Sequence, residues 1–160
     1  MNSKKMLMQE LSRSVFNDPW HGASLKEILD NVDPELVFLK STSNTHSIIE
    51  IALHINSWIE EVTSRFEGTV PANPLSGDWP IPKFDTPEYW EIIKERIYDN
   101  SNRLFLIIDN FPEERLEVIA GEEKNPELGT GFTFRGMIFG ILQHNAYHSG
   151  QISLINKLIQ

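Results

Sequence analysis

Apolar residues recur every three or four positions in four stretches of this chain, which is the spacing of one face of an amphipathic helix. The stretches cover residues 4–16, 47–66, 86–110 and 133–159, and proline occurs in them only at position 87. Pro87 follows Thr86 and precedes Glu88, the order of residues that starts a helix. The pattern therefore predicts four long helices.

Shorter elements are predicted between these stretches. Ser24 with Glu27, and Ser47 with Glu50, have the spacing of a capping box, which predicts a short helix from Ser24 to about Asn31 and the start of the second long helix. Residues 33–39 and 113–119 are each expected to form a brief helical turn, and the acidic segment 121–131 is expected to be exposed.

Residues 68–82 show neither helical nor strand periodicity and contain prolines at positions 71, 74, 80 and 82. A connection this long in a compact domain is usually a lid, a binding loop or a disordered segment. Its aromatic residue, Trp79, favours docking on the helices, so we expect Trp79 to be largely buried. The predicted fold is all-α, a single domain over residues 1–160, in which a long crossover joins the second and third helices of a four-helix bundle.

Two histidines interrupt the aliphatic face of the last predicted helix. His144 and His148 are four residues apart, so both imidazoles project from one face. Two neutral imidazoles in this arrangement suit a divalent metal, with bonds of about 2.0–2.1 Å. The pair alone is a weak signal, because core histidines with hydrogen-bond partners are at least as common. Gln151 is on the same side and could orient a ligand or contact a bound water.

A third imidazole is available on the second long helix, where His54 lies beside the apolar face. Three protein ligands and one open position are the arrangement of a catalytic zinc site. Other metal patterns fit less well. The sequence has no Glu-x-x-His for a carboxylate-bridged di-iron centre, and Asn145 occupies the position of the glutamate in a helical zinc-protease motif.

Composition limits the function classes. The net charge of −9 argues against a nucleic-acid partner, which needs clustered lysine and arginine. No apolar run approaches eighteen residues, and residues 1–6 do not resemble a signal peptide, so we expect a cytoplasmic protein with no membrane partner. The chain has no cysteine, so any thiol chemistry needs a thiol on another molecule.

Several short motifs together resemble a known family. They are Trp20-His21-Gly22, the region around His54, Asp78-Trp79-Pro80 and the run His144-x-x-x-His148-x-Gly150-Gln151. Over essentially its whole length the chain resembles the DinB-like superfamily, and it is most similar to the YfiT-like metal-dependent hydrolases. The resemblance implies a four-helix bundle, one divalent ion, zinc or nickel, on His54, His144 and His148, and often a homodimer. Some relatives transfer small cytoplasmic thiols to electrophiles.

Three further residues are candidates for a catalytic role. Asp78 could assist a bound water or substrate, although a loop aspartate more often caps a turn. His21 could line the mouth of the site, although a histidine stacked on Trp20 in a turn is equally plausible. Gln151 is the third candidate.

Other residues near these motifs have simpler interpretations. Glu50 could orient His54, but its capping box already explains it. Tyr147 is better explained by core packing than by contact with a substrate. His46 is expected at the surface.

The sequence therefore predicts a metal-dependent enzyme that acts on a small molecule. It is either a hydrolase or a transferase of an external low-molecular-weight thiol. The alternative is a metal-stabilised binding or stress-response protein without turnover. We also expect two copies to pair through helix faces as a homodimer.

Overall fold

The computed structural model describes residues 3–121, 125 and 131–160 of the chain. The helices, in chain order, are α1 (Ser3–Phe16), α2 (Leu25–Asp30), α3 (Ile48–Phe66), α4 (Pro87–Asn110), the short 3₁₀ helix η1 (Glu113–Arg115) and α5 (Phe134–Ile159). Among the described residues, extended pairing is limited to one antiparallel bridge between Ile119 and Thr133. The predicted all-α fold is confirmed.

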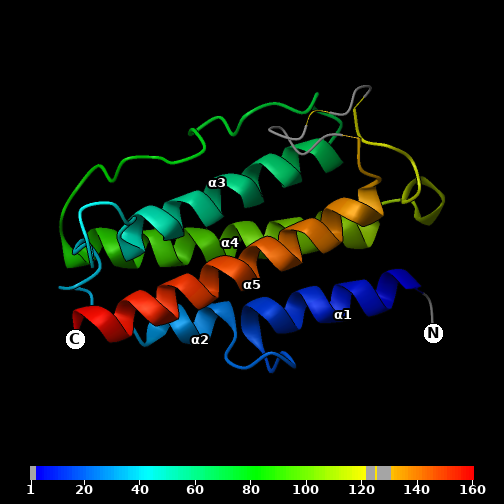
Figure 1. Ribbon diagram of the computed structural model, residues 1–160. Coiled ribbons are helices and arrows are strands. Elements are labelled where there is room, and N and C mark those ends of the chain that lie inside the picture. The colour runs from blue at the N-terminus through cyan, green and yellow to red at the C-terminus, as the bar shows by residue number, and fades with distance from the viewer. Residues whose placement is uncertain (1–2, 122–124, 126–130) are drawn as a thin grey trace.

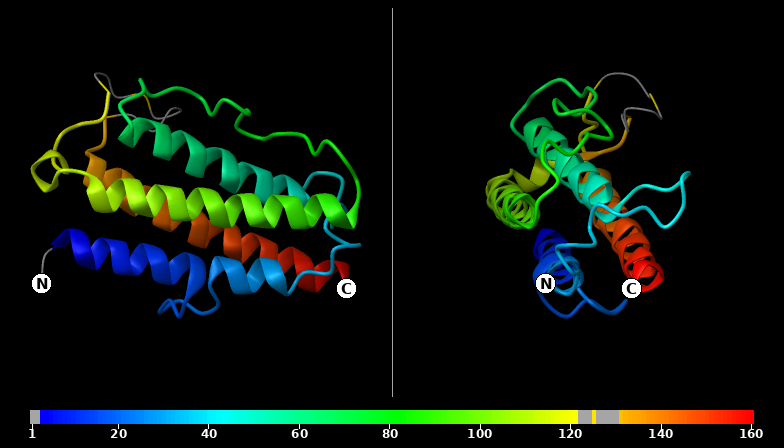
Figure 2. Two further views of the ribbon diagram at one scale, coloured as in Figure 1. Left: turned by 180° about the vertical axis from the view of Figure 1, so that it is seen from behind. Right: turned by 90° about the vertical axis from the view of Figure 1, so that its left-hand side faces the viewer.

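The four long helices form a bundle in which α3 and α4 run in the same direction and α1 and α5 run in the opposite one (Figures 1 and 2). Because α3 and α4 are parallel, the chain must return along the whole bundle between them, and residues 67–86 do so over the outer side of α3. The predicted long crossover between the second and third long helices is therefore confirmed.

Local capping chemistry explains where the helices begin. Ser47 and Glu50 form both hydrogen bonds of the predicted capping box, and Thr86 accepts a hydrogen bond from the Tyr89 amide. Ser24 accepts from the Glu27 amide at a distance of 3.3 Å. Each cap satisfies an amide that has no partner inside its helix.

One of the two predicted brief helical turns differs from the prediction. Residues 34–38 form successive turns instead of a helix, with hydrogen bonds from Leu36 N to Asp33 O and from Leu39 N to Leu36 O. These bonds span three residues because the chain must change direction between α2 and α3. In the segment 113–119, helical structure is confined to η1. Most of the predicted exposed loop 121–131 lies outside the described residues.

Helix α3 is buried on most of its circumference, since the other helices pack on one side and the crossover covers another. A buried ion pair secures the crossover to it. Arg65 Nε donates to Glu61 Oε1 at 2.8 Å, and the Ala72 amide donates to the same oxygen at 3.0 Å. Arg65 also donates to the Ala72 carbonyl. This bonding holds the start of the crossover against α3, on the helix that carries His54.

Candidate metal centre

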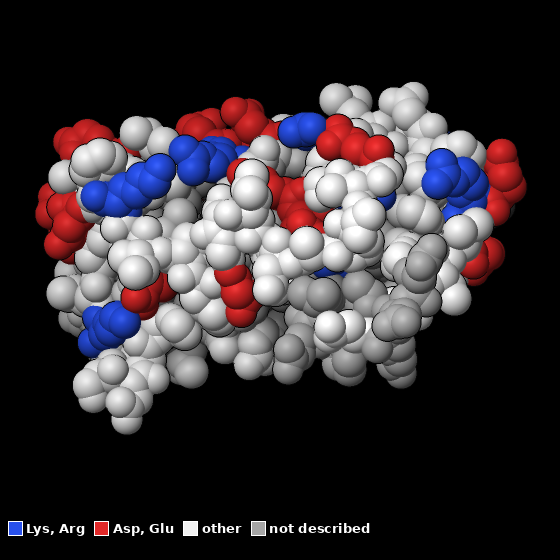
Figure 3. Space-filling view, turned by 90° about the horizontal axis from the view of Figure 1, so that it is seen from above, with Lys and Arg blue, Asp and Glu red and all other residues white. Residues whose placement is uncertain are grey.

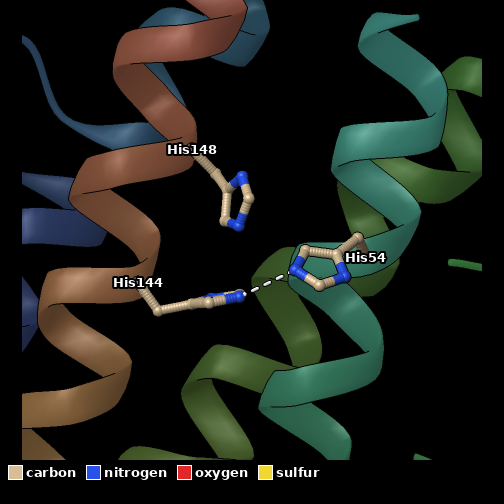
Figure 4. A group of neighbouring side chains, drawn as sticks. All are labelled: His54, His144 and His148. Carbon is tan, nitrogen blue, oxygen red and sulfur yellow. Dashed lines mark hydrogen bonds between the residues drawn. The ribbon is translucent and has the colours of Figure 1, made fainter. Parts of the chain in front are cut away.

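The bundle brings His54 on α3 together with His144 and His148 on α5 (Figure 4). The Nε2 atoms of His54 and His144 are 2.9 Å apart, and the three rings offer ligand atoms that all lie within 4.8 Å of one another. His54 and His148 are buried and His144 is half-buried. Because α3 and α5 are antiparallel neighbours, two histidines one turn apart on α5 can face a single histidine on α3.

The orientation of the His54 ring is set by the crossover. Its Nδ1 lies 2.6 Å from the backbone oxygen of Asp78, which can only accept a hydrogen bond. His54 therefore carries its proton on Nδ1, and its Nε2 has a free lone pair directed at His144. The Asp78 carboxylate in turn accepts a hydrogen bond of 2.7 Å from the Trp58 indole, which holds this part of the crossover in place.

The His148 ring is also oriented by a hydrogen bond at its Nδ1 atom, in this case to a residue of the same helix, α5. Its Nδ1 lies 2.6 Å from Gln151 Oε1, three residues further along α5. With the proton on Nδ1, the Nε2 atom of His148 is available as a ligand. Hydrogen bonds of this kind to the outer nitrogen of a histidine are typical of metal sites, where they set the tautomer and the ring orientation.

The His144 ring has no comparable support. Its Nδ1 and the neighbouring Asn145 Oδ1 are both buried, and neither has a hydrogen-bond partner within the part of the chain that the structure describes. Asn145 occupies the position at which a zinc protease would carry its glutamate, and its side chain is buried in the bundle. It therefore cannot act as a general base at this site.

The donor set fits a divalent metal ion. Tetrahedral bonds of about 2.0–2.1 Å separate ligand nitrogens by about 3.3 Å, so the observed spacing needs only small side-chain adjustments. His144 Nε2–H donates to the lone pair of His54 Nε2 at 2.9 Å, and a metal ion at this point would replace that proton. The hydrogen bonds to Asp78 and Gln151 leave one such lone pair on His54 and one on His148. The group can therefore hold one metal ion, and imidazole ligands suit both zinc and nickel.

Burial also keeps these rings neutral, which is the form that binds metal. Burial lowers the pKa of His144 to about 3, and repulsion from His148 and His54 acts in the same direction. The pKa values of His54 and His148 are lowered as well, again mainly by burial. All three histidines are consequently neutral at pH 7.

The lowered pKa of His144 predicts how the stability of the metal-free protein changes in acid. In the unfolded chain His144 takes up a proton near pH 6.5, whereas in the folded protein its pKa is about 3. The folded state therefore loses free energy of unfolding progressively as the pH falls from 6.5 towards 3. Urea unfolding of chelator-treated protein should show this loss, and His144→Leu should reduce it. An unchanged pH slope in His144→Leu would contradict the prediction.

Trp79 is not largely buried, contrary to the prediction, since 37% of it is exposed. Its indole is stacked between two imidazoles, with centroid distances of 3.7 Å to His46 and 3.9 Å to His54. Because rings cover both faces, the remaining exposure is at the edge of the indole. The predicted position of the crossover near the histidines is confirmed. The contact of His46 with Trp79 was not predicted, because the position of a histidine just before a helix cap does not indicate such a contact.

Of the other residues considered for a role at the site, one lies beside the three histidines and the others do not. Asp78 borders a cavity next to His54 and His144. His21 is exposed in the connector between α1 and α2 and does not line that cavity, and Trp20 is almost fully exposed. Glu50 accepts a hydrogen bond from the Ser47 amide, in agreement with its capping role.

Tyr147 was expected in the core, but 65% of it is exposed. It lies on α5 one position before His148, and its ring is 5.0 Å from the His148 ring in an edge-to-face contact.

The fold and the site together define a class of protein. It is a four-helix bundle in which α3 and α4 are parallel, with a group of three histidines that can hold a metal ion. Residues 20–152 match the DinB superfamily. The chain belongs to the DinB superfamily, as the sequence motifs predicted. A search of curated proteins and a search of solved structures each returned no match. None of the described helices is long and apolar enough to cross a membrane.

Proposed function

We propose that this protein is a metal-dependent enzyme that acts on a small molecule at His54, His144 and His148. The observation that carries the proposal is the convergence of three neutral imidazoles beside a cavity of about 460 Å³. A purely structural metal site is normally closed by a fourth protein ligand. In the described part of the chain, the group of possible ligands consists of these three residues.

The metal, zinc or nickel, would serve as a Lewis acid for a substrate or co-substrate group. The residues of the chain have separate tasks. The three imidazoles supply neutral donors, and the Asp78 carbonyl and Gln151 hold two of them in the ligating tautomer.

Two reactions suit this arrangement. In a hydrolase of the YfiT-like type, the Asp78 carboxylate would accept a proton from water, and it borders the cavity 3.3 Å from His54 Nδ1. In a thiol S-transferase, an external low-molecular-weight thiol would be the co-substrate, since the chain has no cysteine. The non-catalytic alternative is a metal-stabilised binding or stress-response protein.

A reconstitution assay distinguishes these functions. Metal-free protein is loaded with zinc or nickel and is supplied with a model electrophile, with or without a panel of small thiols, and separately with an activated ester. Turnover of the electrophile that needs both metal and thiol supports the transferase, and thiol-independent ester cleavage supports the hydrolase. His54→Ala should abolish either activity, whereas His21→Ala should retain it. Absence of turnover across the panel would favour the non-catalytic protein.

The surface near the site is compatible with a small uncharged or weakly charged substrate. On the face that carries the crossover, basic and acidic side chains are interspersed among the residues that the structure describes (Figure 3). Location in the cytoplasm remains a prediction from the sequence.

We also propose a homodimer, with α5 as the contact surface. Four large apolar residues are exposed on one side of this helix: Phe139, Tyr147, Leu154 and Leu158. Their spacing places them within an arc of about 100°. Light scattering at micromolar concentration should give twice the monomer mass, and Leu154→Glu should shift it to the monomer because a charge would be buried in the contact. A monomeric native protein would contradict this proposal.

A further inference from the structure

The cavity beside the histidines is an elongated groove between α3 and α5. On α3 it is bordered at one-turn intervals by His54, Trp58, Val62 and Arg65, and on α5 it extends from His144 back to Gly136. Because the two helices are antiparallel, both rows lead away from the histidines in the same direction (Figure 1). Eight residues of α5 correspond to about 12 Å, so the groove is several times longer than one reacting group.

The side chains along the groove are mainly apolar. Val62, Met137, Ile141 and Phe132 line it beyond Trp58. Its polar side chains are Asp78, Gln143 and Arg65, in addition to the histidines. Arg65 already donates to Glu61 and to the Ala72 carbonyl, so it contributes mainly its aliphatic stem and the face of its guanidinium.

Two glycines give the groove its depth on the α5 side. Gly136 and Gly140 are one turn apart and both line the cavity. Glycine inside a helix costs about 0.5–1 kcal/mol relative to alanine, so local helix stability does not account for either residue. A methyl group added at Gly140 would contact nothing within 4 Å, whereas one at Gly136 would meet Phe132 and Thr133 at 3.4 Å, so Gly140 borders the more open part of the groove.

We infer that the substrate has an elongated apolar body about 12 Å long, which lies along Gly136 and Gly140, and a polar reactive head at the histidines. Gly140 is then a specificity-determining residue, because a large side chain there would occupy the path of the apolar body. This inference rests on the proposed function for the position of the head, whereas the apolar groove stands independently of any metal.

Two homologous series of probes test the inference by calorimetry on the zinc-loaded protein. Alkyl hydroxamates, from propyl to dodecyl, carry a head that chelates metal, and the matching alkyl alcohols carry one that does not. In both series each additional methylene should tighten binding about fourfold until the groove is filled, the value expected for burial of one methylene. Beyond that length the affinity should stop increasing.

Gly140→Leu should weaken binding of the long-chain probes at least tenfold and leave the shortest hydroxamate unchanged, since only the apolar path is blocked. The matched control is Gly150→Leu on the same helix. A methyl group at Gly150 also meets nothing within 4 Å, but this residue lies outside the groove. The control should bind the full series as the native protein does.

The possible results test the groove inference and the metal-site proposal independently of each other. Affinity that does not depend on chain length in either series, or equal chain-length dependence in Gly140→Leu and native protein, would overturn the inference. Hydroxamates that bind no more tightly than the matching alcohols would instead refute the metal-site proposal, while chain-length dependence in the alcohols would still support the groove.

Discussion

Alanine at His54, His144 or His148 is expected to weaken metal binding by more than about 100-fold. Loss of an outer hydrogen-bond partner costs about 10–100-fold in metal affinity, and the loss of a ligand removes a direct bond. Zinc or nickel content after dialysis should therefore fall sharply in each variant, and any activity should disappear in all three. The bundle itself should stay folded, since the core of all four long helices is apolar.

Matched variants make this result specific. His21→Ala and His46→Ala should keep their metal, because neither residue is part of the three-histidine group. Gln151→Ala, which removes the acceptor on His148, should weaken binding by about 10–100-fold without abolishing it. Full metal occupancy in His54→Ala would refute the triad, and Asp78 would become the candidate third ligand.

Glu61→Ala is expected to lower the free energy of unfolding by about 3–5 kcal/mol, the cost of removing one partner of a buried ion pair. Arg65 is 3% exposed and would retain a buried charge, and the Ala72 amide would lose its acceptor. The crossover should also loosen, so metal affinity should fall through the His54–Asp78 contact. Urea unfolding and metal titration measure the two effects.

A surface ion pair at the end of α3 provides the control. Arg103 on α4 donates to Glu67, the C-cap residue of α3, at 2.7 Å, and both side chains are exposed. Glu67→Ala should therefore change the free energy of unfolding by no more than about 1 kcal/mol. A Glu61→Ala cost no larger than that of Glu67→Ala would show that the buried pair does not secure the crossover.

The metal group could be predicted in part because some of its geometry is local. His144 and His148 share a face for the same reason that any residues four apart in a helix do, and the position of Gln151 three residues later follows from the same period. His54 was predicted as the third member because it lies beside the apolar face of another long helix, and the resemblance to the DinB superfamily agreed with that choice.

Local rules also account for the helices of the bundle. Capping residues at Ser47 and Thr86, the proline at position 87 and the apolar period depend only on neighbours in the chain, so the sequence by itself determined four long helices and a long crossover. It also determined that no cysteine takes part.

Only the tertiary structure decided how the crossover meets the site. The acceptor for His54 is the backbone carbonyl of Asp78, a group that every residue has and that no sequence pattern marks. The stack of Trp79 between His46 and His54 joins the crossover to α3 and to the residue just before α3, and so does not follow from spacing within one helix. The groove beyond the histidines likewise exists only because two antiparallel helices set glycines on α5 against apolar side chains on α3. Such contacts depend on the packing of whole helices, whereas helix periods and caps depend on residues a few positions apart.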